Sequence, residues 1–201
     1  MIAAPRPTAL PRLATDAAGA ATVEFAVVVP VLAMLLLGTL EFGTNLYMRN
    51  VLEGAMQQAG RNSGLQTAQS GQTAIDDAVR SRVQAILPNA TVNFRRESYA
   101  SFSRVNKPED FTDTNANGVY DSTECFQDAN GNRTWDADTA RSGLGGANDV
   151  VEYTATVSYP SLIPGGQALG ISPTTTITAT TVLKNQPFAT QPSWTTTQVC
   201  P

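Results

Sequence analysis

The sequence predicts an α+β protein in which a long N-terminal transmembrane helix continues into a small domain with a second helix and an antiparallel β-sheet. Three observations predict this fold class. An uncharged apolar run fills residues 25–40, apolar and polar residues alternate over 151–159 and 174–184, and an acidic insert precedes these strands. The domain boundaries follow: a leader at 1–19, a transmembrane and spine helix at 20–62, and an exported α+β domain at 63–201 that carries the insert at 109–142.

The apolar run is the core of the predicted membrane helix. Together with residues 20–23 and 42–47 it reaches the length needed to cross a hydrocarbon layer of about 30 Å, with Glu41 at the far interface. Pro30 removes one helical hydrogen bond, which membrane helices tolerate. Apolar residues at three- and four-residue spacing then extend the helix beyond the bilayer, to an end at Asn62-Ser63-Gly64.

The exported domain has weaker but readable signals. A polar linker at 66–72 precedes a helical stripe over 73–87, where Thr73 and Asp76 have the spacing of a capping box. Residues 91–99 alternate enough to form a further strand, and residues 160–173 connect the two later strands. We expect the resulting antiparallel sheet to pack on the long helix.

Composition narrows the function. Histidine is absent, which removes the commonest general base and transition-metal ligand. The net charge of −4 and the lack of a basic stripe argue against nucleic acid as a partner. Two cysteines cannot build a structural zinc site. We therefore expect a structural or binding protein and not an enzyme; an envelope hydrolase would have only the acidic cluster to use.

That cluster repeats a fifteen-residue unit. Residues 109–138 hold eight of the seventeen acidic residues and one basic residue, Arg133. Two copies read Phe-x-Asp-x-Asn-x-Asn-x-x-aromatic-Asp, beginning at Phe111 and Phe126. The first copy fits the calcium-loop pattern Asp-x-Asn-x-Asn-Gly-x5-Glu, in which hard oxygens surround the ion and Gly118 permits the sharp turn. Its predicted ligands are Asp113, Asn115, Asn117, the carbonyl of Val119, Asp121 and a bidentate Glu124.

The second copy fits the calcium pattern less well. Arg133 replaces the turn glycine and Thr139 stands where glutamate should close the loop, so either Asp138 or a shared Glu124 has to complete it. The predicted ligands are Asp128, Asn130, Asn132, Thr134, Asp136 and Asp138. Structural calcium would order an insert that buries little apolar surface. The predicted fold class is therefore α+β with a calcium-loop insert. The alternative is a surface turn region, which Asn, Asp and Gly also favour.

The two cysteines lie at the insert and at the end of the chain. In an oxidising compartment, a disulfide between Cys125 and Cys200 would pin the tail at 186–201 onto the insert. An intermolecular bond and two buried free thiols are the alternatives.

The N-terminal residues carry a family resemblance. The segment Gly19-Ala20-Ala21-Thr22-Val23-Glu24-Phe25, followed by Ala-Val-Val-Val-Pro, resembles the TadE-like minor pilins and pseudopilins of the tight-adherence (Flp, type IVc) pilus system. This resemblance covers residues 19 to about 62. The segment Ile177–Phe188 is similar to the tail of many TadE-like domains. For the residues between these two segments, the resemblance implies very little.

The resemblance implies processing, docking and location. A prepilin peptidase would cut between Gly19 and Ala20, after a leader containing Arg6 and Arg12. Glu24, beside Phe25, would then dock subunits by pairing with the N-terminal amine of a neighbour. The implied partners are other pilin or pseudopilin subunits through the N-terminal helix, the peptidase and inner-membrane lipid. The implied location is the bacterial inner membrane with a periplasmic C-terminal domain, or the cell surface in an adhesive pilus.

Other interpretations of the N-terminus remain open. A secretory signal would need a small-x-small cleavage site after the apolar run, and residues 38–40 and 43–45 are poor candidates. An uncut signal anchor would leave Glu24 without a role. The protein would then be a membrane-anchored, calcium-stabilised envelope binding module outside any filament. A buried core helix would need a far larger domain around it.

Overall fold

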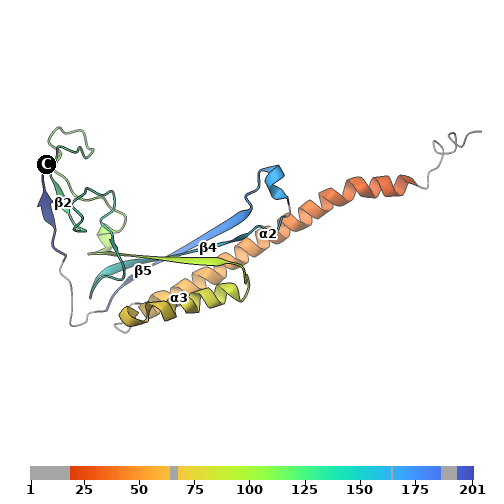
Figure 1. Ribbon diagram of the computed structural model, residues 1–201, viewed down its shortest axis with the longest axis horizontal. Helices are drawn as coiled ribbons and strands as arrows, with labels where there is room; N and C mark the ends of the chain where they lie inside the picture. The colour runs from red at the N-terminus through yellow and green to blue at the C-terminus, as the bar shows by residue number, and fades with distance from the viewer. Residues whose placement is uncertain (1–18, 64–67, 164, 187–193) are drawn as a thin grey trace, which may run out of the picture.

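One helix, α2 (Ala20–Ser63), forms the long axis of the molecule, and the domain lies along its second half (Figure 1). The computed structural model describes residues 19–63, 68–163, 165–186 and 194–201; the leader predicted at 1–18 lies outside the described residues. The other elements are α3 (Ala68–Gln84), β1 (Thr91–Tyr99), η2 (Phe102–Arg104), β2 (Phe126–Asp128), β3 (Arg141–Ser142), β4 (Val150–Pro160), η3 (Gly166–Leu169), β5 (Thr174–Lys184) and β6 (Thr197–Val199).

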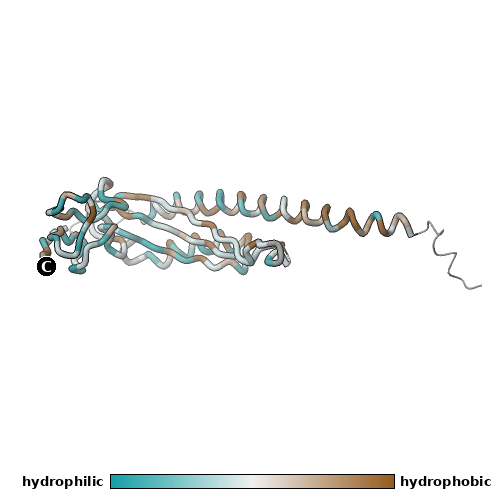
Figure 2. The backbone as a smooth tube through the Cα atoms, turned by 90° about the horizontal axis from the view of Figure 1, so that it is seen from above, coloured by the Kyte–Doolittle hydropathy of each residue, from teal (hydrophilic) through white to brown (hydrophobic). Residues whose placement is uncertain are grey.

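The two halves of α2 have different surroundings. No side chain from Gly19 to Tyr47 is buried, and this half is strongly hydrophobic, as Figure 2 shows at the free end of the helix. Within the described part of the chain, α2 is the one helix long and apolar enough to cross a membrane. From Met48 onward one face is buried against the domain. The helix extends to Ser63, the last described residue before the gap at 64–67, and Pro30 lies within it.

Among the described residues, four strands form an antiparallel sheet in the order β3-β1-β4-β5. The predicted strands at 91–99 and 174–184 agree with β1 and β5, and β4 extends the predicted strand by one residue at each end. Phe94 pairs with Ala155, which pairs in turn with Ala179. The two-residue β3 was not predicted because it is too short to show an alternating pattern.

The apolar core lies between α2, α3 and one face of this sheet. Its members share near-complete burial: Met48, Leu52, Ala55, Met56, Ala59, Val79, Val83, Ala90, Val92, Tyr153, Ala155, Val157, Tyr159, Ile177 and Ala179. The helix and sheet approach closely at Gly60, where an added Cβ would lie 3.1 Å from Cγ2 of Thr181. The opposite face of the sheet is polar, with hydroxyl pairs such as Thr154–Thr180 across the strands. The predicted packing of the sheet on the long helix is therefore what the structure has.

The second helix begins earlier than the sequence predicted. α3 starts at Ala68 and continues through the segment predicted as linker, with a break at Gly71, whose φ of −110° and ψ of 16° are not helical. Thr73 therefore lies inside the helix, and the predicted capping box is wrong. The helical stretches on either side of Gly71 are separated by this kink. The Asp76 carboxylate instead accepts hydrogen bonds from the Arg96 guanidinium and the Tyr153 hydroxyl, which ties α3 to the sheet.

The insert and the C-terminal tail form a separate layer at the end of the sheet farthest from the free end of α2 (Figure 1). β2 pairs antiparallel with β6, with Phe126 opposite Val199. Cys125 and Cys200, next to these strands, form the predicted intramolecular disulfide. The tail is thus joined to the insert by both backbone pairing and a covalent bond, while residues 187–193 lie outside the described residues.

Candidate functional sites: the exposed helix and the paired loops

The residues predicted to be cut and to dock subunits lie at the free end of α2. Gly19 and Ala20 are exposed at the start of the helix. Glu24 is also exposed and makes no hydrogen bond or ion pair with another described residue. Beside it, the Phe25 side chain is 68 % exposed. The structure therefore leaves this carboxylate and its apolar neighbours open to contact from outside the chain.

The other acidic residue at an end of the apolar run has partners. Glu41 Oε2 accepts a hydrogen bond of 2.7 Å from the Leu162 amide, and Oε1 accepts one of 2.8 Å from the Thr175 hydroxyl. Tyr159 lies nearby, where burial and, to a lesser extent, the Glu41 charge raise the pKa of its hydroxyl. The sequence predicted Glu41 at the membrane interface but gave no sign of its contacts with the β4–β5 connection.

The first predicted calcium loop is folded around its own acidic side chains. The Asp113 carboxylate accepts hydrogen bonds from the amides of Asn117 and Gly118, at 3.2 and 2.8 Å. The side-chain amides of Asn115 and Asn117 both donate to Asp121. The amide of Val119 donates to the side-chain oxygen of Asn117. All five of these predicted ligand positions therefore lie in one connected turn.

Glu124 closes this first loop. Its carboxylate accepts hydrogen bonds from the Thr114 amide, at 2.7 Å, and from the Asp121 amide, at 3.2 Å. The residue is 1 % exposed. A buried carboxylate that joins the first and last turns of the loop lies where the sequence pattern puts the closing glutamate.

The second loop repeats this arrangement. The Asp128 carboxylate accepts hydrogen bonds from the amides of Gly131, Asn132 and Arg133. The side-chain amides of Asn130 and Asn132 donate to Asp136, and the Thr134 amide donates to Asn132. The left-handed backbone also repeats: Arg133 has φ 63° at the position of Gly118, and Gly131 has φ 86° at the position of Ala116.

The second loop is closed by a residue that the sequence analysis missed. Glu109 accepts hydrogen bonds from the amides of Ala129 and Asp136, at 2.7 and 3.2 Å, and these positions correspond to Thr114 and Asp121. Glu124 stays with the first loop, and Asp138 accepts from the Tyr99 hydroxyl instead. Neither of the two predicted closing residues accepts these hydrogen bonds, which go to Glu109 from the preceding segment.

Glu109 could have been found from the repeat itself. It precedes Phe111 as Glu124 precedes Phe126, so the repeated unit begins two residues earlier than the pattern we aligned. Each glutamate accepts hydrogen bonds from the loop of the other repeat unit, so the contact joins the two repeats. Burial is the largest influence on Glu109 and raises its pKa, while hydrogen bonds from the amides of the loop act in the opposite direction.

Aromatic rings join the two loops. Tyr120 and Trp135, which occupy the same position in the two units, stack with ring centroids 4.8 Å apart. Phe111 meets Trp135 edge-on, Phe126 meets Tyr120 edge-on, and the Trp135 indole donates to the Glu109 carbonyl. The insert thus has a small aromatic core of its own, which explains the matched aromatic positions of the repeat.

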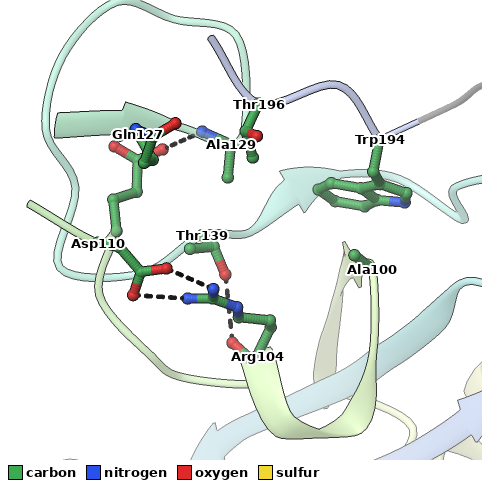
Figure 3. Close-up of a pocket in the computed structure, with 9 residues that line it drawn as sticks. Ala100, Arg104, Asp110, Gln127, Ala129, Thr139, Trp194 and Thr196 are labelled. Carbon is green, nitrogen blue, oxygen red and sulfur yellow. Dashed lines mark hydrogen bonds and ion pairs between the residues drawn. The ribbon is translucent and has the colours of Figure 1, made fainter. Parts of the chain in front are cut away.

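A small cavity lies where the insert meets the tail (Figure 3). Its volume is about 70 Å³, and Figure 3 shows the ion pair between Arg104 and Asp110 on one side and Trp194 on another. Pockets that bind organic ligands usually measure about 300–1,000 Å³, so this cavity is suited to water. Among the described residues, no three acidic or cysteine side chains converge closely enough to hold a metal by themselves.

These features define a small α+β domain built on an N-terminal helix of membrane-spanning length, which is consistent with membrane anchoring. Residues 19–61 match a family model described as TadE-like protein. The match confirms the resemblance recognised in the N-terminal residues, and it covers almost the whole of α2. The domain beyond residue 61, including the segment at 177–188, lies outside the match. No curated protein and no solved structure matches this chain.

Proposed function

We propose that this chain is a TadE-like minor pilin or pseudopilin that takes part in assembling an adhesive tight-adherence pilus. The observation that carries the proposal is the coincidence of the family match with α2, whose first half is exposed, apolar and free of charge from Phe25 to Leu40. In this role α2 anchors the protein in the inner membrane and then packs against other subunits, and the α+β domain lies in the periplasm. The role is structural and involves no catalysis by this chain.

Processing after Gly19 supplies the chemistry of docking. Cleavage frees the amine of Ala20, and the exposed Glu24 carboxylate then pairs with the amine of a neighbouring subunit. Inside a helix bundle both charges are desolvated, so loss of one partner leaves an uncompensated charge that is costly, by about 3–5 kcal/mol. This cost makes correct pairing a condition of incorporation.

The N-terminus of membrane-extracted protein tests this proposal. We expect an N-terminus at Ala20 and the matching intact mass only when a prepilin peptidase is present. An intact Met1, or a start beyond residue 40, would reject processing of this kind. In the cut protein, Glu24→Ala should abolish incorporation into filaments while export continues. Glu53→Ala is the matched control, because Glu53 is exposed on the same helix but lies beyond the apolar half.

We also propose that calcium binds both loops of the insert and stabilises it. Two features support this: each loop presents alternating Asp and Asn oxygens, and each has a buried glutamate as its closing residue, Glu124 in the first loop and Glu109 in the second. Oxygen-rich sets of this kind suit calcium, which takes six to eight oxygens. The amide hydrogen bonds to Asp113 and Asp128 leave these carboxylates with unused acceptor capacity.

Equilibrium dialysis with calcium tests this second proposal. We expect two ions per chain, with Kd values of about 10⁻⁴–10⁻³ M as in extracellular modules. Glu109→Gln should weaken the second site and Glu124→Gln the first, each leaving the other site bound. Asp77→Asn, on the exposed surface of α3, is the control and should bind two ions. If both glutamate variants still bind two ions as tightly as the wild type, the ligand assignment is contradicted.

A further inference from the structure

We propose that the loop joining β4 and β5 rests on the lipid bilayer, with Leu162 and Ile171 in contact with lipid. This hairpin loop comprises residues 161–163 and 165–173. The inference rests on the proposed membrane anchoring by α2 and extends it, because it gives the domain a second contact with the membrane. The partner is the lipid surface next to the helix.

The loop lies at the level where the apolar part of α2 ends. The helix from Ala20 to Leu40 is about 30 Å long, which matches the hydrocarbon thickness of a bilayer. Glu41, the first charge after this run, marks the level at which the hydrocarbon ends. Its carboxylate holds the Leu162 amide at 2.7 Å, so the loop lies at that level. Figure 1 shows this part of the chain against α2, at the end of the domain nearest the exposed half of the helix.

The composition of the loop also suits contact with lipid. The sequence has no charged residue between Glu152 and Lys184, a stretch that includes the whole loop. Leu162 and Ile171 are each 38 % exposed. The acidic residues of the insert lie at the other end of the sheet. The loop is therefore uncharged, and it exposes two apolar side chains close to the end of the apolar half of α2.

The backbone of the loop is suited to a surface with little water. An unpaired amide or carbonyl next to lipid is costly. Here the Ser161 amide donates to the Pro173 carbonyl, and the Ile171 amide donates to the Gly166 carbonyl. Gly170 has φ 76°, which lets the chain turn back at this point. Gly166 lies against Ile171, because an added Cβ on Gly166 would lie 3.1 Å from the Ile171 Cβ.

Depth-dependent fluorescence quenching tests the inference on the full chain in phosphatidylcholine vesicles at low protein density. The two native cysteines form the disulfide, so Leu162→Cys and Ile171→Cys each provide one free thiol for an NBD label. We expect blue-shifted emission, strong quenching by lipid spin-labelled near the headgroup, and severalfold weaker quenching by aqueous iodide than at a control. The control is Phe102→Cys, in η2 beyond the end of β1 remote from the loop, where the native side chain is 59 % exposed.

A third label separates failure of the loop from failure of the anchor. Val31→Cys lies in the apolar half of α2, where the native side chain is 60 % exposed. One outcome is that lipid spin-labelled deep in its acyl chain quenches the label at 31, while lipid spin-labelled near the headgroup leaves the labels at 162 and 171 unquenched. The anchoring then stands and the loop inference is overturned. If neither lipid nor iodide quenches the labels at 162 and 171, protein covers the loop, and the loop inference is again overturned. An unquenched label at 31 would reject the anchoring on which both rest.

Discussion

The two ends of the domain are stabilised by different kinds of interaction. Where α2 and α3 cover the sheet, apolar side chains such as Leu52, Met56 and Val83 are excluded from water. In the insert, carboxylates and carboxamides hold the backbone, with one aromatic cluster and one disulfide as reinforcement. We expect the first region to be stabilised mainly by burial of apolar side chains, and the second mainly by its disulfide and, in our proposal, by bound ions. Five predictions test this division.

The largest effect is expected in the apolar core. Leu52→Ala should lower the free energy of unfolding by about 2–5 kcal/mol, because it leaves a cavity beneath a fully buried side chain. Denaturant unfolding of the full chain in detergent, followed by circular dichroism, measures it. Leu46→Ala, on the exposed half of the same helix, should change the value by less than about 0.5 kcal/mol. Equal losses in both variants would contradict the proposed extent of the core.

Removing the disulfide should affect the other region. The double variant Cys125→Ser, Cys200→Ser opens a covalent loop whose ends are 75 positions apart in the sequence. Such a change typically lowers the free energy of unfolding by about 2–4 kcal/mol. We expect faster hydrogen exchange in β2 and β6, while the amides at the centre of β4 keep their protection. Loss of protection throughout the sheet would show that the two regions are not separate.

Calcium removal should affect the same region as the loss of the disulfide. At a free concentration of about 100 times Kd, a bound ion stabilises the folded state by about 2.7 kcal/mol. Adding a chelator should therefore expose the Tyr120–Trp135 cluster, seen as a change in near-ultraviolet circular dichroism. The unfolding transition of the core should move little. Magnesium at the same concentration is the control for ionic strength.

At the junction of the two regions, stability should depend on pH through Glu97. Burial is the main cause that raises the pKa of this carboxyl, Asp138 and Glu152 add to it, and Arg95 opposes it. A raised pKa favours the protonated folded state, so this contribution is present at low pH and is lost as the pH rises through the folded pKa. Glu97→Gln should make the denaturation midpoint depend less on pH as the pH rises from about 4, the ordinary pKa range of a glutamate. Glu53→Gln, on the exposed face of α2, should leave the wild-type slope.

The smallest effect is expected on the polar face of the sheet. Thr180→Ala removes one hydroxyl of the pair with Thr154, whose oxygens are 3.0 Å apart. A cross-strand pair contributes about 0.2–1 kcal/mol. Denaturant unfolding should show a loss in this range, and the double variant with Thr154→Ala should lose little more. Additive losses would mean that the two hydroxyls do not interact.

The sequence predicted the regular elements of the first region because they are long. The strands at 91–99 and 174–184 and the long helix over 20–62 agree with the structure, since alternation and helical spacing need several residues to become visible. β2, β3 and β6 have two or three residues each and form through contacts with distant parts of the chain. Local patterns carry no information about such pairing.

In the candidate sites, the sequence predicted which residues come together within one loop but missed the contacts that join one loop to the other repeat. The residues of the first calcium pattern do lie in one connected turn, because their spacing is a local property. Glu109 was missed because its partners Ala129 and Asp136 belong to the other repeat. Likewise, the contact of Glu41 with Leu162 joins residues 121 positions apart. Aligning the repeats two residues earlier would have recovered the first of these contacts but not the second.

The direction of β5 relative to α2 has a mechanical consequence. Glu41 contacts Thr175 and Gly60 contacts Thr181, so the strand runs alongside the helix in the same sense. A pull on the exposed end of α2, such as extraction from a membrane, is therefore applied along the length of the strands. The contacts between helix and sheet bear that load together, in shear, instead of opening one after another from an end.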